Sequence, residues 1–155
     1  MNLEKTLTQY GLAMPQPPEK GGLYEPVKAF GANLFYLSGC GPNLNGEKKY
    51  EGKIGREYTI EEGRQAARCC VLNLLAVLQK RLGSLNKVKR IVKLTVFVAC
   101  ADDFYSQPEV ANGASGLLVE IFGAEAGCGA RSAVGANALP FNIPVEIEAL
   151  VEAYS

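Results

Sequence analysis

A long amphipathic helix, predicted from Thr59 to Gly83, constrains the fold more than any other feature of this sequence. Thr59 and Glu62 have the spacing of a capping box, in which a hydroxyl and a carboxylate bind free N–H groups of the first turn. Gly83 supplies the stop, because glycine readily takes the left-handed conformation that ends helices. Between them apolar side chains recur at helical spacing, at Ala67, Val71, Leu74, Leu75, Leu78 and Leu82. One apolar stripe of this kind predicts one packed face.

Strands are predicted on both sides of this helix in the sequence. Tyr24–Phe30 and Asn33–Ser38 are short strand-like runs separated by Gly31 and Ala32, which is typical of a hairpin. Val88–Val98 predicts a longer strand with two different faces. One face is apolar except for Arg90 and contains Val88, Val92, Leu94, Val96 and Val98; the other is mixed and contains Lys89, Ile91, Lys93, Thr95 and Phe97.

The C-terminal part predicts a second helix and two more strands. The helix runs from about Pro108 to Phe122 and ends at Gly123. Arg131–Ala136 is a short strand and Val145–Tyr154 alternates cleanly, so the two are expected to form a closing hairpin. The order hairpin, helix, strand, helix, hairpin predicts an α+β sheet with both helices on one face. The opposite face mixes apolar and charged side chains, which favours a subunit interface and a homo-oligomer.

Residues 1–22 are predicted to form an appendage that packs on a single domain, residues 23–155. Asn2–Gly11 has a weak amphipathic pattern with Leu3, Leu7 and Tyr10 on one side, and the prolines and glycines that follow predict a linker. No run near the start is apolar enough for a signal peptide, and no segment approaches the ~20 apolar residues of a membrane span. A cytoplasmic protein is therefore expected.

The absence of histidine excludes several kinds of function, and the charge balance argues against others. Lys+Arg and Asp+Glu both total 16, and a chain with zero net charge has no electrostatic footprint for nucleic acid or a membrane surface. Histidine is absent, which excludes Ser-His-Asp and Cys-His catalysis and histidine-containing zinc sites. The five cysteines are odd in number and contain no C-x-x-C pair, so neither a disulfide framework nor a metal site is predicted. Acid–base chemistry must use carboxylates, Lys, Tyr, Cys, the backbone or water.

Charged side chains on the last two strands are the candidates for chemistry. Arg131 begins a strand after a glycine-containing loop, and a guanidinium fork is well suited to binding a carboxylate through two parallel hydrogen bonds. An ordinary surface salt bridge is the other interpretation of this arginine. Glu146 and Glu148 project from one strand face, about 6.5–7 Å apart by the strand rise. They could orient or deprotonate a water, or pair with Lys89 or Lys93, and both interpretations remain open.

Several segments together resemble the RidA/YjgF family of reactive-intermediate deaminases, also called endoribonuclease L-PSP. The segments begin with Leu37-Ser38-Gly39 and the strand Val92–Val98. They continue with Ala130-Arg131-Ser132-Ala133-Val134, and end with Leu139-Pro140 followed by Val145-Glu146-Ile147-Glu148-Ala149. The resemblance covers roughly residues 24–154 in the expected order. The N-terminal extension is similar to that of a divergent branch of the family.

The resemblance implies a chorismate-mutase-like α+β fold, a homotrimer, and sites between subunits. The implied activity is hydrolysis of enamines and imines to 2-oxo acids and ammonia, which needs no metal and no cofactor. Arg131 matches the arginine that binds the substrate carboxylate, and Glu146 matches the acidic residue that positions the attacking water. Gly39 and Ala133 match backbone positions that line the pocket, and Tyr24 and Asn112 match a tyrosine and an asparagine of the family.

One departure concerns the pocket itself, since residue 133 is Ala where the main branch commonly has Cys. The substitution removes a side chain and leaves the backbone groups in place. Two other functions are considered beside the deaminase. One is a non-catalytic protein of the same fold that binds small carboxylates or has a regulatory role, and the other is an endoribonuclease, against which the neutral charge argues.

Overall fold

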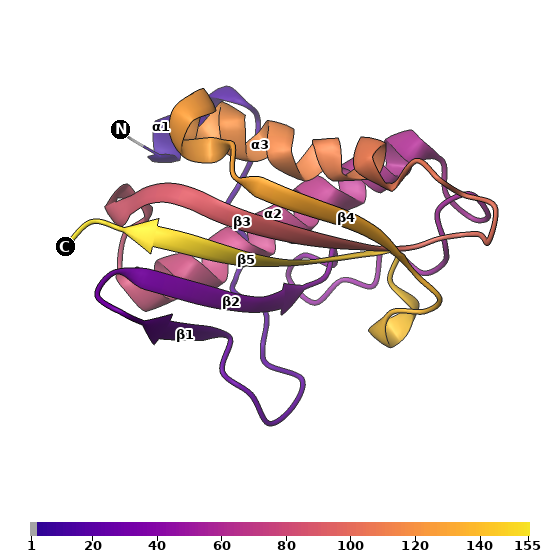
Figure 1. Cartoon of the computed structure of the whole chain (residues 1–155), viewed down its shortest axis with the longest axis horizontal. Coiled ribbons are helices and arrows are strands. Elements are labelled where there is room, and N and C mark those ends of the chain that lie inside the picture. Colours follow the sequence, from indigo (N-terminus) through magenta and orange to yellow (C-terminus); the bar gives the residue numbers. More distant parts are fainter. Residues whose placement is uncertain (1–2) are drawn as a thin grey trace.

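A five-stranded mixed sheet carries two long helices on one face in the computed structural model, which describes residues 3–155 (Figure 1). The strands are β1 (Val27–Phe30), β2 (Leu34–Cys40), β3 (Val88–Ala99), β4 (Ala130–Ala136) and β5 (Val145–Ala153). The helices are α1 (Leu3–Gln9), α2 (Ile60–Leu82) and α3 (Gln107–Gly127), with short 3-10 turns η1 (Leu85–Lys87) and η2 (Pro140–Asn142). The α+β class expected from the order of elements is confirmed.

The strand order is β1-β2-β5-β3-β4, which corrects one expectation from the sequence. β4 and β5 do not form a hairpin, because β3 lies between them and pairs with both. The pairing of β3 with β4 is parallel, and α3 makes the crossover that a parallel pair requires. β5 then returns antiparallel on the other side of β3, and β4 is left at the edge of the sheet.

Helix α2 begins and ends as its sequence predicts. The backbone N–H of Glu62 donates to Thr59 Oγ1 at 3.2 Å, and the Thr59 N–H donates to Glu62 Oε2 at 2.8 Å, which completes the capping box. Gly83 ends the helix with φ of 82°. Helix α3 packs across it, and Gly113 lies where a Cβ atom would collide with the Arg64 backbone. The close approach of the two helices explains this glycine inside a helix, despite its low helical propensity.

The two long strands differ in how well the sequence predicts their faces. β5 alternates strictly between buried and half-buried residues, as expected. β3 has two register shifts against β5, one before Arg90 and one between Ile91 and Lys93. The shifts place Ile91, 5% exposed, in the core opposite Val151, so the expectation that Ile91 lies on the open face with Phe97 is wrong. A bulge inserts one residue and reverses the faces of a strand beyond it.

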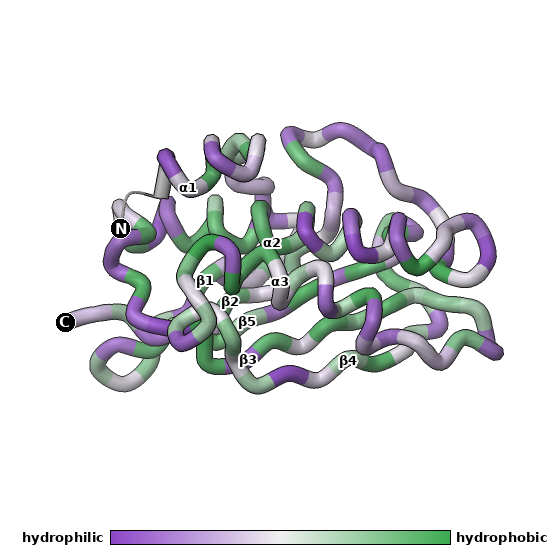
Figure 2. Tube along the Cα trace, turned by 90° about the horizontal axis from the view of Figure 1, so that it is seen from above, coloured by the Kyte–Doolittle hydropathy of each residue, from purple (hydrophilic) through white to green (hydrophobic). Residues whose placement is uncertain are grey.

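The core lies between the sheet and the two long helices, and the N-terminal segment adds to it. Figure 2 shows apolar stretches recurring through the sheet and α2, whereas the connecting loops are mostly hydrophilic. Leu7 of α1 is buried in the core cluster, and Leu12 and Met14 of the linker pack against it. Tyr10 follows α1 and is exposed, and Asn2 lies outside the described residues. The linker backbone is also held by a hydrogen bond from the Gln16 N–H to Asn45 Oδ1 at 2.9 Å.

Candidate functional site

A hollow of about 1040 Å³ lies beside the end of β2 and the start of β5. It brings together three of the residues predicted for the site, Tyr24, Gly39 and Glu146. The N-terminal linker, the η2 turn and α2 complete its walls, with Pro18, Glu19, Lys20, Asn73, Val77, Pro140, Phe141, Asn142 and Ile143 among the lining residues. We call this hollow the Glu146 pocket.

Glu146 is a half-buried carboxylate with no hydrogen-bond or ion-pair partner among residues 3–155. Burial, followed by repulsion from Glu148, raises the pKa of its carboxyl above the ordinary value. Gly39 lies directly against this group, and a Cβ atom at residue 39 would collide with the carboxylate. A larger residue could not occupy position 39 without moving Glu146, so the glycine shapes this side of the pocket.

The lysines that were alternative partners for the two glutamates bind elsewhere. Lys89 Nζ forms an ion pair with Glu152 at 2.9 Å, and Lys93 Nζ donates to Ser132 Oγ at 2.6 Å. Glu148 instead accepts a hydrogen bond from the Tyr36 hydroxyl at 3.1 Å. The interpretation in which Lys89 or Lys93 pairs with Glu146 or Glu148 is therefore wrong.

Arg131 is held by neutral oxygen atoms, all from α3. Its Nη1 donates to Asn112 Oδ1 at 2.9 Å and to Ser115 Oγ at 3.1 Å, and its Nη2 donates to the Pro108 carbonyl at 3.4 Å. No carboxylate in the described part of the chain forms a salt bridge with Arg131, so the surface salt-bridge interpretation is wrong. A guanidinium has five N–H donors, and Nε and one hydrogen of Nη2 remain without an acceptor among these contacts. The arginine is oriented while its charge stays unneutralised.

The side chains of Arg131 and Glu146 project from opposite faces of the sheet within one chain. Arg131 pairs with Leu94, whose side chain is buried on the helix face. Glu146 pairs with Phe97 on the open face. Asn112 therefore accompanies Arg131 on the helix side, and Ala133, partly buried against the core, likewise does not line the Glu146 pocket. The six predicted site residues therefore form two separate groups. One contains Tyr24, Gly39 and Glu146, and the other contains Asn112, Arg131 and Ala133.

Other residues of the two groups were not predicted as functional. Ser115 lies three residues after Asn112, and that spacing places both on one helix face toward Arg131. Asn73 is 2% exposed and donates from Nδ2 to the carbonyls of Gly41 and Asn43, which holds the turn beside the pocket. Phe141 has an exposed side chain and lines the pocket, and nothing in its local sequence indicated this.

Two buried thiols, Cys40 and Cys70, are not activated as nucleophiles, and the described acidic groups and thiols form no metal site. Burial raises the pKa of Cys40 to about 12 and holds that of Cys70 well above its ordinary value, so neither thiol is activated. No group of three or more Cys, Asp and Glu side chains within residues 3–155 is placed to hold a metal ion. Over the same residues, no helix is both long and apolar enough to span a bilayer.

The fold and the two groups define an α+β domain that presents a half-buried carboxylate and an unneutralised arginine. A model of the family described as "YjgF/chorismate_mutase-like, putative endoribonuclease" matches residues 4–152. Protein TCP17 of Trypanosoma cruzi is 40% identical over 146 residues, which span 94% of this chain and 91% of that protein. The chain belongs to the YjgF/chorismate mutase-like family.

Solved structures agree with this assignment. A crystal structure described as "a putative endoribonuclease" from Shewanella oneidensis MR-1 has a TM-score of 0.93 at 33% identity and covers 98% of this chain and 99% of its own. The structure of RidA from the Antarctic bacterium Psychrobacter sp. PAMC 21119 has a TM-score of 0.61 at 26% identity, covering 88% of this chain and 94% of its own.

Proposed function

We propose that this protein hydrolyses small enamine and imine carboxylates to 2-oxo acids and ammonia, as a cytoplasmic homotrimer with sites between subunits. The observation that carries the proposal is the state of Arg131. Its guanidinium is fixed by Asn112, Ser115 and a backbone carbonyl, yet no acidic side chain in residues 3–155 neutralises it. A fixed cation with two free N–H donors is a binding site for a carboxylate.

Glu146 would supply the second requirement of this reaction, a positioned water. Above its raised pKa the carboxyl is ionised and accepts a proton from a water held in the pocket. The water oxygen bonds to the imine carbon while the π electrons of the C=N bond move to nitrogen, which takes up a proton. The resulting carbinolamine loses ammonia as its hydroxyl proton leaves, and a 2-oxo acid remains. Enamines enter the same sequence after protonation at carbon gives the imine.

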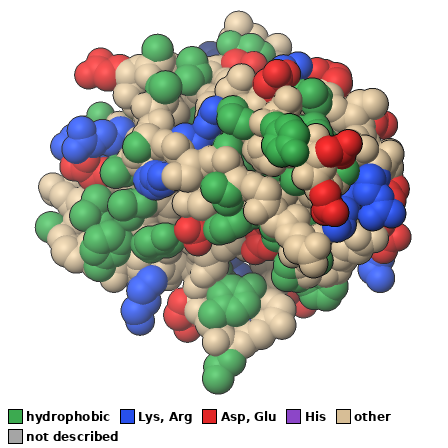
Figure 3. All heavy atoms as spheres, turned by 45° about the vertical axis from the view of Figure 1, so that its right-hand side comes forward, with side chains coloured by type: hydrophobic (Ala, Val, Ile, Leu, Met, Phe, Trp, Pro, Cys, Tyr) green, Lys and Arg blue, Asp and Glu red, His purple; other side chains and the backbone are tan. Residues whose placement is uncertain are grey.

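The imine carbon is already electrophilic, so the reaction needs neither a strong nucleophile nor an imidazole. Holding the carboxylate and one water supplies proximity and orientation, which can remove about 7–11 kcal/mol of a barrier in favourable cases. RNA cleavage by the usual acid–base route would need histidine, and the chain has none. The charges on the face seen in Figure 3 are also interspersed rather than gathered into a basic patch.

The separation of Arg131 from Glu146 supports assembly from several copies. In one chain the sheet lies between the two groups, while β4 is an edge strand that another copy can approach. The open face also carries Tyr36 and Val134, both exposed apolar side chains that a neighbouring copy would cover. A cyclic arrangement would place Arg131 of one copy beside the Glu146 pocket of the next.

The proposal is tested by the release of ammonia from 2-aminoacrylate generated in situ by a pyridoxal-phosphate lyase. The wild-type protein is expected to accelerate the release, and the Arg131→Ala variant is expected to lose the acceleration while its oligomeric state is unchanged. Absence of any acceleration by the wild-type protein would reject the deaminase. Binding of 2-oxo acids without turnover would instead indicate the non-catalytic carboxylate-binding protein.

A further inference from the structure

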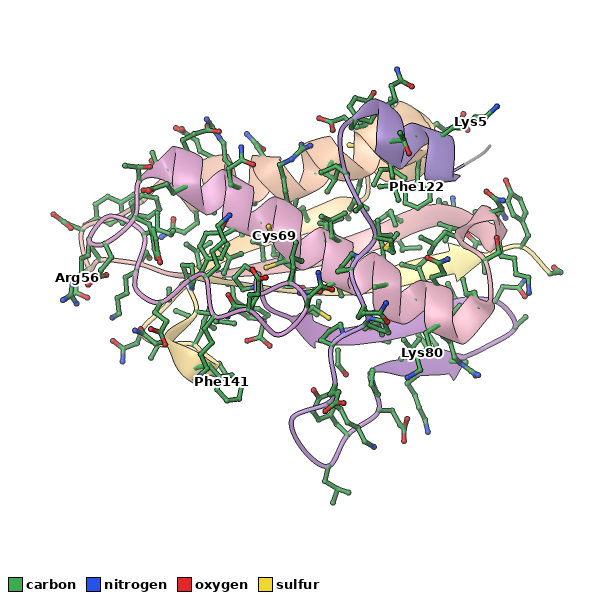
Figure 4. All side chains as sticks on the ribbon, turned by 180° about the vertical axis from the view of Figure 1, so that it is seen from behind. Lys5, Arg56, Cys69, Lys80, Phe122 and Phe141 are labelled. Carbon is green, nitrogen blue, oxygen red and sulfur yellow. The ribbon has the colours of Figure 1, made fainter. Side chains whose placement is uncertain are left out.

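The face of the sheet opposite α2 and α3 carries two charged side chains without an oppositely charged partner. Figure 4 shows α2 in front of the sheet on the helix side, whereas in Figure 1, seen from the other side, the strands lie in front. Lys93 of β3 and Glu148 of β5 both project from this open face, and both are half-buried. Neither belongs to an ion pair within residues 3–155. Both charges become costly once the face is covered and water leaves it.

Neutral hydrogen-bond partners hold these two charges toward opposite edges of the sheet. Lys93 Nζ donates to Ser132 Oγ of β4 at 2.6 Å, so the cation lies on the β4 side. Glu148 accepts from the Tyr36 hydroxyl at 3.1 Å, and Tyr36 belongs to β2, on the other side of β5. The hydrogen bond to Glu148 raises the pKa of the Tyr36 hydroxyl, which therefore stays a neutral donor. Both charges are oriented by these hydroxyl groups and neutralised by neither.

The other charged residues of the same strands do not supply the missing partners. Lys89 and Arg90 of β3 both bind Glu152 of β5, at 2.9 and 2.6 Å. Glu146 lies in the pocket beside Gly39, and Lys28 of the edge strand β1 has an exposed side chain that water can solvate. The cation on the β4 side and the anion on the β2 side are therefore left for a contact outside the chain.

We infer that Lys93 of one copy forms an ion pair with Glu148 of the next copy, and that this pair sets the head-to-tail direction of the ring. The inference rests on the proposed function, whose shared sites require the β4 side of one copy to face the β2 side of the next. That approach brings the cation of one copy onto the anion of its neighbour. Tyr36 and Val134, exposed on the two sides, are covered by the same contact and exclude water from the pair, which strengthens the attraction.

The test reverses each charge and then both, and follows the molar mass of the full-length protein by light scattering over a dilution series. Lys93→Glu and Glu148→Lys are each expected to raise the concentration at half-assembly about 100-fold or more, because like charges then face each other. The double variant with both substitutions restores opposite charges, and it is expected to assemble within about tenfold of the wild-type concentration. Lys80→Glu of α2, labelled in Figure 4, and Glu125→Lys of α3 are the matched controls, since both side chains are exposed on the helices.

Each result decides the inference. Single variants that assemble like wild type would overturn it, and so would dissociated single variants that the double variant does not restore. Dissociation of either control would trace the effect to net charge and would also overturn it. Recovery in the double variant supports the ion pair and excludes misfolding as the cause of dissociation.

Failure of the inference can be told apart from failure of the proposed function. A wild-type protein that is a monomer or a dimer would overturn both the ion pair and the proposed ring. Ammonia release from imines, measured on the same preparations, tests the reaction alone. Assembly that follows the charge exchange in a protein that hydrolyses no imine would support the ion pair and reject the deaminase.

Discussion

Replacing Arg131 with alanine removes the proposed carboxylate site while leaving the pocket that contains Glu146. The guanidinium has two N–H donors left over from its bonds to Asn112, Ser115 and the Pro108 carbonyl. A substrate carboxylate would accept both, and a hydrogen bond to a charged group contributes about 1.5–3 kcal/mol. Two such hydrogen bonds together contribute about 3–6 kcal/mol. Because Arg131 is half-exposed, we take the lower part of this range, about 3–4 kcal/mol. The expected loss in kcat/KM is therefore about 10²–10³-fold.

The same substitution is expected to have a smaller effect on folding. It removes three hydrogen bonds at a half-exposed position, which lowers the free energy of unfolding by about 1–2 kcal/mol. For a chain of this size that corresponds to a decrease in Tm of about 2–8 °C, so the variant remains folded at assay temperature.

The assay is ammonia release from an imine generated in situ, measured over a range of substrate concentrations. Arg131→Lys retains the charge without the planar fork and is expected to recover only part of the loss. Arg90→Ala is the control, since Arg90 is an exposed arginine of β3 that binds Glu152 rather than the proposed site. A kcat/KM for Arg131→Ala within about threefold of wild type would refute the reasoning, because the loss of even one hydrogen bond to a charged group lowers kcat/KM by more than that factor.

Substitutions at three other residues give distinct expected outcomes. Glu146→Gln is expected to lower kcat about 10²–10³-fold in the imine assay, and unchanged turnover would exclude Glu146 as the base. Because burial and Glu148 raise the pKa of Glu146, its ionisation destabilises the fold as pH rises through that pKa. Thermal unfolding should therefore show Glu146→Gln more stable than wild type at neutral pH, and the difference in stability should vanish below the ordinary carboxyl pKa. Wild-type kcat/KM is expected to rise with pH between the ordinary and the raised pKa. A difference in stability that does not depend on pH would contradict this account. Phe141→Gly is expected to raise the free energy of unfolding by about 0.5–1 kcal/mol, because glycine takes a positive φ without strain. A lower free energy of unfolding for this variant in chemical denaturation would be inconsistent with backbone strain at Phe141. Asn112→Asp is expected to impair kcat/KM more than Asn112→Ala, because a carboxylate at that position would neutralise Arg131; the reverse order, measured in the same assay, would show that charge is not what matters there.

The sequence predicted the fold best where local signals agreed with the global arrangement. The capping box at Thr59, the stop at Gly83 and the alternation of β5 were all confirmed, because each depends on residues close together in the chain. The expected hairpin of β4 with β5 was wrong, since neighbours in sequence were taken as neighbours in the sheet and β3 lies between them. Strand order depends on the crossover through α3, which no local pattern encodes.

The candidate site was predicted mainly by the family resemblance, and the geometry was added by the structure. Periodicity alone could not place Asn112 of α3 beside Arg131 of β4, because the contact depends on how α3 packs over the sheet edge. Two bulges in β3 moved Ile91 to the core, and bulges leave little signal in a single sequence. Phe141 has a left-handed backbone conformation, which bulky residues rarely adopt, so its conformation could not be predicted from the sequence either.

The most direct test of the account mixes two inactive variants. Arg131→Ala and Glu146→Gln are expected to be inactive alone, since each lacks one half of every site. In a cyclic trimer assembled at random from equal amounts of both, about one quarter of the shared sites receive an intact Arg131 from one copy and an intact Glu146 from its neighbour. The account predicts recovery of about one quarter of wild-type ammonia release in coexpressed protein, with mixed trimers verified by native mass spectrometry. Mixed trimers with no more activity than either variant alone would contradict a site shared between copies.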